Sequence, residues 1–149
     1  MAKQPQIVVP LDGSELAEEA LGEAFALAKT FNAEVTLLQA VPIPDVVVQH
    51  GDMTLSTGEQ WENRKDAALQ YLNSVCSRPE WNGIRMHVAV EAGNPAEGIL
   101  NYCQEHFIDK IVMTTHGRTG VSRWVFGSVA YKVVHGADRT VVLIRPLNA

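Results

Sequence analysis

Hydrophobic residues along this chain form short continuous runs that alternate with longer segments in which they recur every three or four positions. The short runs have the length and composition of β-strands and span residues 7–11, 35–41, 84–90, 111–113 and 140–144. The longer segments have the period of amphipathic helices and span residues 15–31, 61–75, 96–103 and 125–133. The sequence therefore predicts five strands separated by four helices.

The connections between these segments determine how the strands pair. A crossover that contains a helix joins parallel strands and is right-handed in nearly all known cases. Residues 7–11, 35–38 and 111–113 are apolar on both faces, as expected of a sheet covered by helices on both sides. We expect one domain over residues 1–149, folded as a three-layer α/β/α sandwich around a five-stranded, doubly wound parallel sheet.

Two of the predicted helices begin at residues suited to cap them, whereas one connection has no clear pattern. Ser14 is followed by acidic residues that favour the positive end of a helix dipole, and Asn94-Pro95 can cap and start a later helix. Residues 42–58 have no clear period and contain two prolines and two glycines. At that length, we expect a functional loop or a mobile excursion.

The charge of the chain limits its partners. Its 149 residues include 12 Lys and Arg and 17 Asp and Glu, a formal net charge of −5. Nucleic acid and anionic membranes would repel such a protein, so we expect neither as a partner. From Lys110 onward, however, there are 6 basic residues and only one acidic residue, Asp138. This basic end would attract a compact anion such as a phosphate, unless it is only a solvated mixed surface.

Cysteine content and hydropathy indicate the compartment. Cys76 and Cys103 are too few for a disulfide framework, and Cys103 lies on an apolar helical stripe, where we expect a buried small hydrophobe. The beginning of the chain has no signal-peptide segment, and no stretch approaches 18 apolar residues. We expect a cytoplasmic protein. The histidines other than His116 lie far apart and show no metal-ligand spacing.

A candidate ligand site follows from the predicted topology. Ligands of open α/β sheets bind beyond the carboxyl ends of the strands, where the winding reverses. The first strand ends in Pro10-Leu11-Asp12, and the fourth ends in Thr114-Thr115-His116. If the winding reverses after the third strand, these two strands are neighbours and their ends face one crevice.

The segment after the fourth strand has features of a phosphate site. Gly117 lets the backbone approach a ligand. Gly127-Ser128 opens the last helix, where free amides and the helix dipole suit an anion. Arg118 and Arg123 supply positive charge. The alternative is that these glycines only serve turns.

These residues resemble the signature of the universal stress protein family, G-x2-G-x9-G-[ST]. Gly117, nine further residues and Gly127-Ser128 match its later part, residues 9–15 resemble the first strand and turn, and residues 141–146 resemble the last strand. The likeness spans nearly the whole chain. It implies a Rossmann-like sheet, as in adenine nucleotide alpha hydrolases, with strand order 3-2-1-4-5. It also implies an ATP-binding regulatory module of the stress response.

The resemblance implies roles for individual residues. Asp12 would hold the ribose hydroxyls, and the Ala40 backbone would meet the adenine edge. Pro10, Leu11 and Met113 would line the base and sugar pocket. The residues that would cradle the phosphates, mainly through backbone amides, are Gly117, Gly127, Ser128 and Val129.

The resemblance also implies a cofactor ion and an assembly. A divalent ion, Mg or Mn, would bridge the phosphate oxygens. The family's last strand commonly pairs across a two-fold axis. The implied homodimer edge consists of Val141, Val142, Leu143 and Ile144.

One residue departs from the family signature, because Thr114 stands where its first glycine would be. Two outcomes are open: the branched side chain crowds the nucleotide near the ribose and α-phosphate, or its hydroxyl replaces a lost contact. The first outcome favours a second hypothesis, in which the protein is a nucleotide-free dimeric stress or chaperone-like interaction protein.

Signatures of catalysis are mostly absent from the sequence. It contains no Walker lysine motif, no GxGxxG after the first strand and no GxSxG elbow. His116 has no carboxylate neighbour in sequence to form a relay, so we expect it to hydrogen-bond loop backbone. We expect no enzyme activity beyond, at most, slow ATP hydrolysis.

Overall fold

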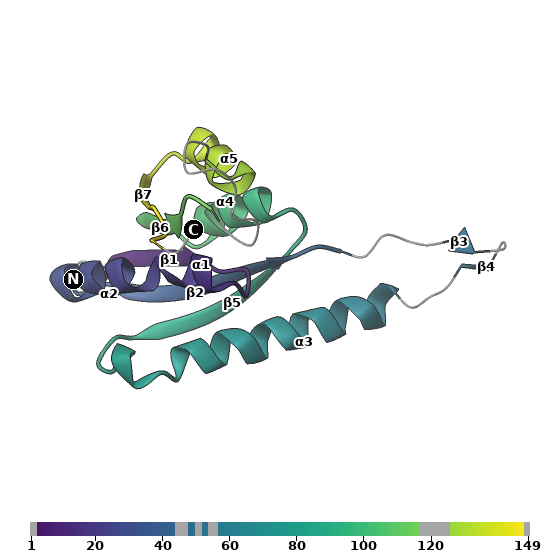
Figure 1. The fold of residues 1–149 in the computed structure, drawn as a ribbon, viewed down its shortest axis with the longest axis horizontal. Coiled ribbons are helices and arrows are strands. Elements are labelled where there is room, and N and C mark those ends of the chain that lie inside the picture. The colour runs from purple at the N-terminus through teal and green to yellow at the C-terminus, as the bar shows by residue number, and fades with distance from the viewer. Residues whose placement is uncertain (1–2, 44–47, 50–51, 54–56, 117–125, 148–149) are drawn as a thin grey trace.

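The computed structural model describes residues 3–43, 48–49, 52–53, 57–116 and 126–147. Its main sheet has five parallel strands in the order β5-β2-β1-β6-β7 (Figure 1). The bounds of these strands are β1 Gln6–Pro10, β2 Glu34–Val41, β5 Met86–Ala92, β6 Lys110–Thr114 and β7 Thr140–Ile144. Numbered along the chain within this sheet, the order is 3-2-1-4-5, which confirms the expected fold.

Helices cover both faces of this sheet, with α3 on one side and α4 and α5 on the other (Figure 1). The α-helix bounds are α1 Glu15–Glu18, α2 Leu21–Phe31, α3 Thr57–Cys76, α4 Pro95–Glu105 and α5 Ser128–Gly136. A 3-10 turn, η1, spans Pro79–Trp81. Both predicted caps are present: Ser14 Oγ accepts the Ala17 amide at 3.2 Å, and Asn94 Oδ1 accepts the Ala96 amide at 3.1 Å.

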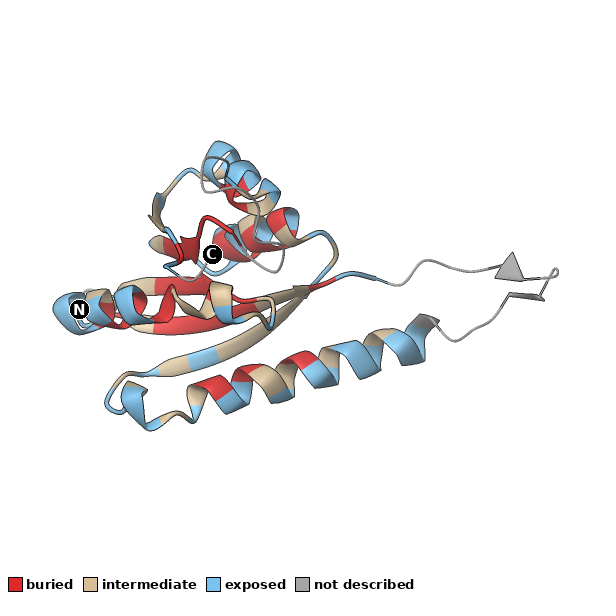
Figure 2. Ribbon diagram, viewed as in Figure 1, coloured by how far each residue is buried: buried red, intermediate tan, exposed pale blue. Residues whose placement is uncertain are grey.

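The alternation of side chains along β1 divides the core into two parts. Ile7 and Val9 pack with the side chains of α1, α2 and α3, whereas Val8 packs with those of α4 and α5. These strand residues are fully or almost fully buried, and the buried positions lie along the centre of the molecule (Figure 2). A doubly covered sheet explains why the run at residues 7–11 carries no polar face.

The predicted helix over residues 15–31 is divided in two. The amides of Glu19 and Ala20 donate to the carbonyls of Leu16 and Ala17, three residues back, before regular helix resumes at Leu21. This tightening is typical of a 3-10 turn at a helix end. It leaves Ala17 and Ala20 both buried against the sheet. An apolar period alone does not reveal such a break.

The connection over residues 42–58 lies only partly within the described residues. Two short strands, β3 Val48–Gln49 and β4 Asp52–Met53, pair antiparallel. The interpretation of this connection as a functional loop or mobile excursion otherwise falls on residues outside the described ranges. In the described part of the chain, no helix is long and apolar enough to cross a membrane.

Candidate functional site

A pocket opens beyond the carboxyl ends of β1 and β6, where the winding of the sheet reverses. β1 pairs with β2 on one side and with β6 on the other, so the chain leaves β1 and β6 in opposite directions across the sheet. The cavity has a volume of about 210 Å³. Its lining residues are Pro10, Leu11, Asp12, Ala17, Ala40, Pro95, Ile99, Met113, Thr114, Thr115, Gly127, Ser128, Val129 and Ala130.

Most of the site residues predicted from the sequence lie in this lining. The structure brings together Pro10, Leu11, Asp12, Ala40, Met113, Thr114, Gly127, Ser128 and Val129. Gly117 and Arg118, with Arg123, lie outside the described residues. The binding roles of all these residues stay predictions, since the structure establishes only their positions.

Four lining residues were not predicted from the sequence, namely Ala17, Pro95, Ile99 and Ala130, whereas Thr115 was expected at this edge only as part of the end of the fourth strand. Pro95 starts α4 directly after β5, so the rule that ligands bind at the carboxyl edge could have found it. Ala17, Ile99 and Ala130 are apolar residues on helices, and in sequence they are indistinguishable from ordinary core residues.

The amino terminus of α5 faces this pocket through Ser128, Val129 and Ala130. The first amides of a helix have no acceptor within the helix. Among the described residues, no side chain caps this end, and the first turn of α5 contains no acidic residue. The helix dipole adds partial positive charge at the same place. This wall of the pocket is therefore suited to an anion.

Gly127 holds this helix start against the end of β6. Its amide donates to the Thr115 carbonyl at 2.7 Å. A Cβ at this position would lie 2.9 Å from the same carbonyl oxygen, closer than real Cβ contacts. The close approach of the two backbones therefore requires glycine here.

Asp12 is fixed at the rim of the pocket by the turn that follows β1. Its Oδ1 accepts hydrogen bonds from the Ser14 amide at 2.9 Å and from the Ser14 hydroxyl. Gly13 between them adopts a φ of 87°, which favours glycine. Asp12 thus serves both as the turn-forming residue and as part of the pocket lining.

The wall formed by α1 is attached to α3 through Glu18. The Tyr71 hydroxyl donates to Glu18 Oε2 at 2.7 Å, and Arg78 Nη2 lies 2.6 Å from Oε1. Burial, followed by the hydrogen bond to the carboxylate, raises the pKa of Tyr71 above its ordinary value. The phenol therefore stays neutral and can keep donating its proton to Glu18.

The end of β6 uses its polar side chains internally. The Thr114 hydroxyl donates to the His116 carbonyl at 2.6 Å. Thr115 Oγ1 lies 3.1 Å from His116 Nδ1, and the buried Nε2 has no partner among the described residues. The loop whose backbone the His116 ring was expected to bond lies outside the described residues, so that expectation stays a prediction.

A cysteine thiol and a cluster of possible metal ligands lie outside the pocket. Cys103 is buried, and burial raises its pKa to about 11, as expected of an inert core thiol. The ligand atoms of Glu91, Glu105 and His106 lie within 4.8 Å of one another, although Glu105 and His106 are exposed. Sequence spacing missed this group because Glu91 comes from β5 and the other two residues come from the end of α4.

A comparison with protein families identifies the chain. Residues 5–145 match the model of the universal stress protein family. The chain belongs to this family. A universal stress protein of Methanocaldococcus jannaschii, MJ0531, is 32% identical over 144 residues, which cover 94% of this chain and 81% of the relative. The family resemblance found in the sequence is confirmed.

Solved universal stress proteins share the fold. UspA from Lactobacillus plantarum has a TM-score of 0.73 and 27% sequence identity, covering 97% of this chain and 100% of that one. The universal stress protein from Archaeoglobus fulgidus, solved in complex with dAMP, has a TM-score of 0.59 and 19% identity, covering 97% of this chain and 100% of that one. The Archaeoglobus fulgidus protein therefore has this fold and was solved with a bound adenine nucleotide.

Proposed function

We propose that this universal stress protein is an ATP-binding regulatory module of the stress response. The observation that carries the proposal is the pocket at the carboxyl edge, where apolar residues line one cavity with the amino terminus of α5, which no described side chain caps. An adenine base needs an apolar slot, and a polyphosphate needs backbone amides and positive potential. The dAMP complex of the Archaeoglobus fulgidus relative supports this assignment.

Within this proposal, each wall of the pocket has a task. Asp12 holds the ribose hydroxyls, and the Ala40 backbone meets the adenine edge. Ser128 and Val129 bind the phosphates through backbone amides. Gly127, whose own amide donates to the Thr115 carbonyl, leaves room for the phosphates because it has no side chain. Asp12 is the single carboxylate among the described lining residues. A donor set of this kind fits a Mg²⁺ or Mn²⁺ ion that takes most of its ligands from phosphate oxygens and water. Such an ion would neutralise phosphate charge.

Calorimetric titration with ATP tests the proposal. In magnesium, we expect saturable binding near one nucleotide per chain, and we expect weaker binding after the magnesium is chelated. A protein preparation shown to be free of nucleotide that gives a flat titration would overturn the assignment. The same ligand must also raise the melting temperature, because it binds only the native state.

We also propose a homodimer formed through β7. Within the described residues, β7 is an edge strand that pairs only with β6, and its residues 141–144 are half-buried. Exposed apolar edges of this kind invite pairing with another chain. Sedimentation equilibrium should give twice the chain mass of 16.3 kDa, with slowed amide exchange over residues 141–144. A monomer at micromolar concentration would contradict it.

This edge also favours the second candidate function, a nucleotide-free dimeric interaction protein. The two candidates differ in one readout. If dimers form and no adenine nucleotide changes the melting temperature, the second candidate stands. If ATP binds stoichiometrically, the second candidate function is excluded.

A further inference from the structure

Thr114 places a buried hydroxyl at the point where β6 enters the pocket. It is the last residue of the strand, is only 5% exposed and belongs to the pocket lining. Its hydroxyl is not directed at a ligand, since Oγ1 donates to the His116 carbonyl at 2.6 Å. The side chain therefore connects the strand end to the second residue after it.

The residue that this hydrogen bond spans, Thr115, also anchors the neighbouring elements. The Thr115 amide donates to the Ile144 carbonyl of β7 at 2.9 Å. The Thr115 carbonyl accepts the Gly127 amide at 2.7 Å, which fixes the residue that precedes α5. The direction of the backbone at Thr115 and His116 thus determines where the first amides of α5 lie.

We propose that the Thr114 hydroxyl is a positioning group for the phosphates of the bound nucleotide. The hydroxyl acts without touching the ligand. By donating to the His116 carbonyl, it fixes the direction of the neighbouring Thr115 carbonyl. The Thr115 carbonyl in turn accepts the Gly127 amide and so positions Gly127 and the first amides of α5. The inference rests on the proposed nucleotide site. It adds that Thr114 contributes to recognition of the phosphates and not of the nucleoside.

Three substitutions separate the hydroxyl from the methyl group of Thr114. Thr114→Val keeps the size and removes the donor. Thr114→Ser keeps the donor and removes the methyl group. Thr114→Gly removes both. A donor lost from a buried carbonyl is not replaced by water, so the valine variant leaves the strand end free to shift.

The matched control is Thr36→Val in β2. Thr36 is also buried, at 3% exposure, and its hydroxyl bonds to Tyr102 away from the pocket lining. Its replacement removes one buried hydroxyl of the same kind from the same sheet. We expect this variant to melt at a lower temperature and to bind ATP as the native protein does.

The experiment measures the Kd for ATP and for adenosine on the purified proteins, with adenosine at millimolar concentration competing against labelled ATP. For Thr114→Val, we expect the ATP Kd to rise about tenfold, the effect of losing one hydrogen bond, and the adenosine Kd to change less than about twofold. Thr114→Ser should stay within about threefold of native for both ligands, and Thr114→Gly should resemble the valine variant.

Each other outcome overturns the inference or the proposal beneath it. Native ATP affinity in a folded Thr114→Val variant would remove the positioning role. Equal loss of ATP and adenosine would show a general structural defect, and a tenfold loss in Thr114→Ser would assign the effect to the methyl group. If the native protein itself binds neither ligand, the proposed nucleotide function fails, and with it this inference.

Discussion

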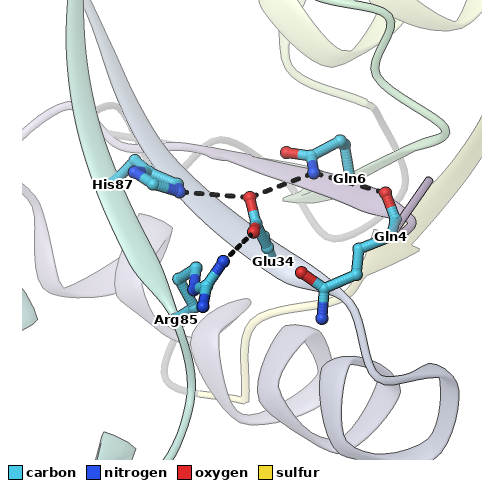
Figure 3. A network of polar contacts seen from close by, with 5 residues as sticks. All are labelled: Gln4, Gln6, Glu34, Arg85 and His87. Atoms are coloured by element: carbon cyan, nitrogen blue, oxygen red, sulfur yellow. Dashed lines mark hydrogen bonds and ion pairs between the residues drawn. The ribbon is translucent and has the colours of Figure 1, made fainter.

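The two ends of the central sheet use their polar groups in different ways. At the amino end, side chains from β1, β2 and the start of β5 bond to one another around Glu34 (Figure 3). Glu34 Oε2 accepts a hydrogen bond from Gln6 Nε2 at 3.1 Å and lies 3.2 Å from His87 Nε2. Glu34 Oε1 accepts a hydrogen bond from Arg85 Nη1 at 3.0 Å. The carboxylate is thus held from three sides within the protein.

At the carboxyl end, the side chains of Asp12, Thr114 and Thr115 also bond within the protein, but the backbone amides at the start of α5 face the pocket. The first amides of α5 have no acceptor within their helix, and no side chain of the described residues caps them. A polar group surrounded by internal partners stabilises the fold, whereas one directed into a cavity can bind a ligand. We therefore expect the polar groups at the amino end to contribute to stability and those at the carboxyl end to ligand binding. Separate variants can test the two roles.

The largest expected effect concerns Gly127 at the carboxyl end. In Gly127→Ala, the new Cβ would lie 2.9 Å from the Thr115 carbonyl oxygen, so the start of α5 must move. We expect ATP affinity to fall on the order of 100-fold, about 2.7 kcal/mol, in calorimetric titration. The control is Gly22→Ala in α2, where nothing lies within 4 Å of a Cβ, and which should bind ATP as the native protein does. A folded alanine variant with native affinity would refute this role of α5.

The next effect concerns Glu34 at the amino end. Glu34→Gln keeps the shape of the side chain but replaces one carboxylate oxygen with an NH2 group. This donor would face the donors that now bond to the carboxylate. We expect a loss of about 1 kcal/mol in the free energy of unfolding, measured by urea denaturation at pH 7. ATP affinity should not change. A variant of native stability that binds ATP more weakly would reverse the division of roles between the two ends.

The arrangement of the sheet was largely predictable from the sequence. The predicted strand over residues 140–144 matches β7, because a β-branched run bounded by polar residues leaves little choice. The predicted strand over residues 84–90 is instead displaced to Met86–Ala92. The amide of Ile84 donates to the Trp81 carbonyl in the turn after η1, so a hydrophobic residue at the edge of the pattern is used in the turn.

The two ends of the sheet differ in how far the sequence predicts them. The carboxyl-end residues follow from a topological rule and a local glycine pattern, which is why Asp12 and Gly127 were found. The amino-end cluster joins Gln6, Glu34 and Arg85, which are widely separated along the chain. No local pattern signals such a cluster, because it depends on the register in which β1 and β5 flank β2.

The pH dependence of stability gives a smaller effect at the amino end. The hydrogen bond from Gln6, and then those from His87 and Arg85, hold the pKa of Glu34 below its ordinary value of 4.5. The carboxylate therefore stabilises the fold above about pH 4.5, and this stability is lost as the pH falls through the lowered pKa. Urea midpoints measured from pH 6 to pH 3 should fall more steeply for the native protein than for Glu34→Gln. Parallel curves would exclude this contribution.

The smallest expected effect separates the partners of Glu34 from one another. The Arg85 side chain is 70% exposed, so its ion pair with Glu34 is screened by water, whereas Gln6 is half-buried. We expect Arg85→Ala to lower the free energy of unfolding by less than about 0.5 kcal/mol, and Gln6→Ala to lower it by about 0.7 kcal/mol, less than Glu34→Gln. Urea denaturation in low and high salt tests the order, since only the arginine contribution should shrink with salt. A larger, salt-sensitive loss in Arg85→Ala would mean that the charge of Arg85, and not the half-buried amide of Gln6, makes the main contribution at the amino end.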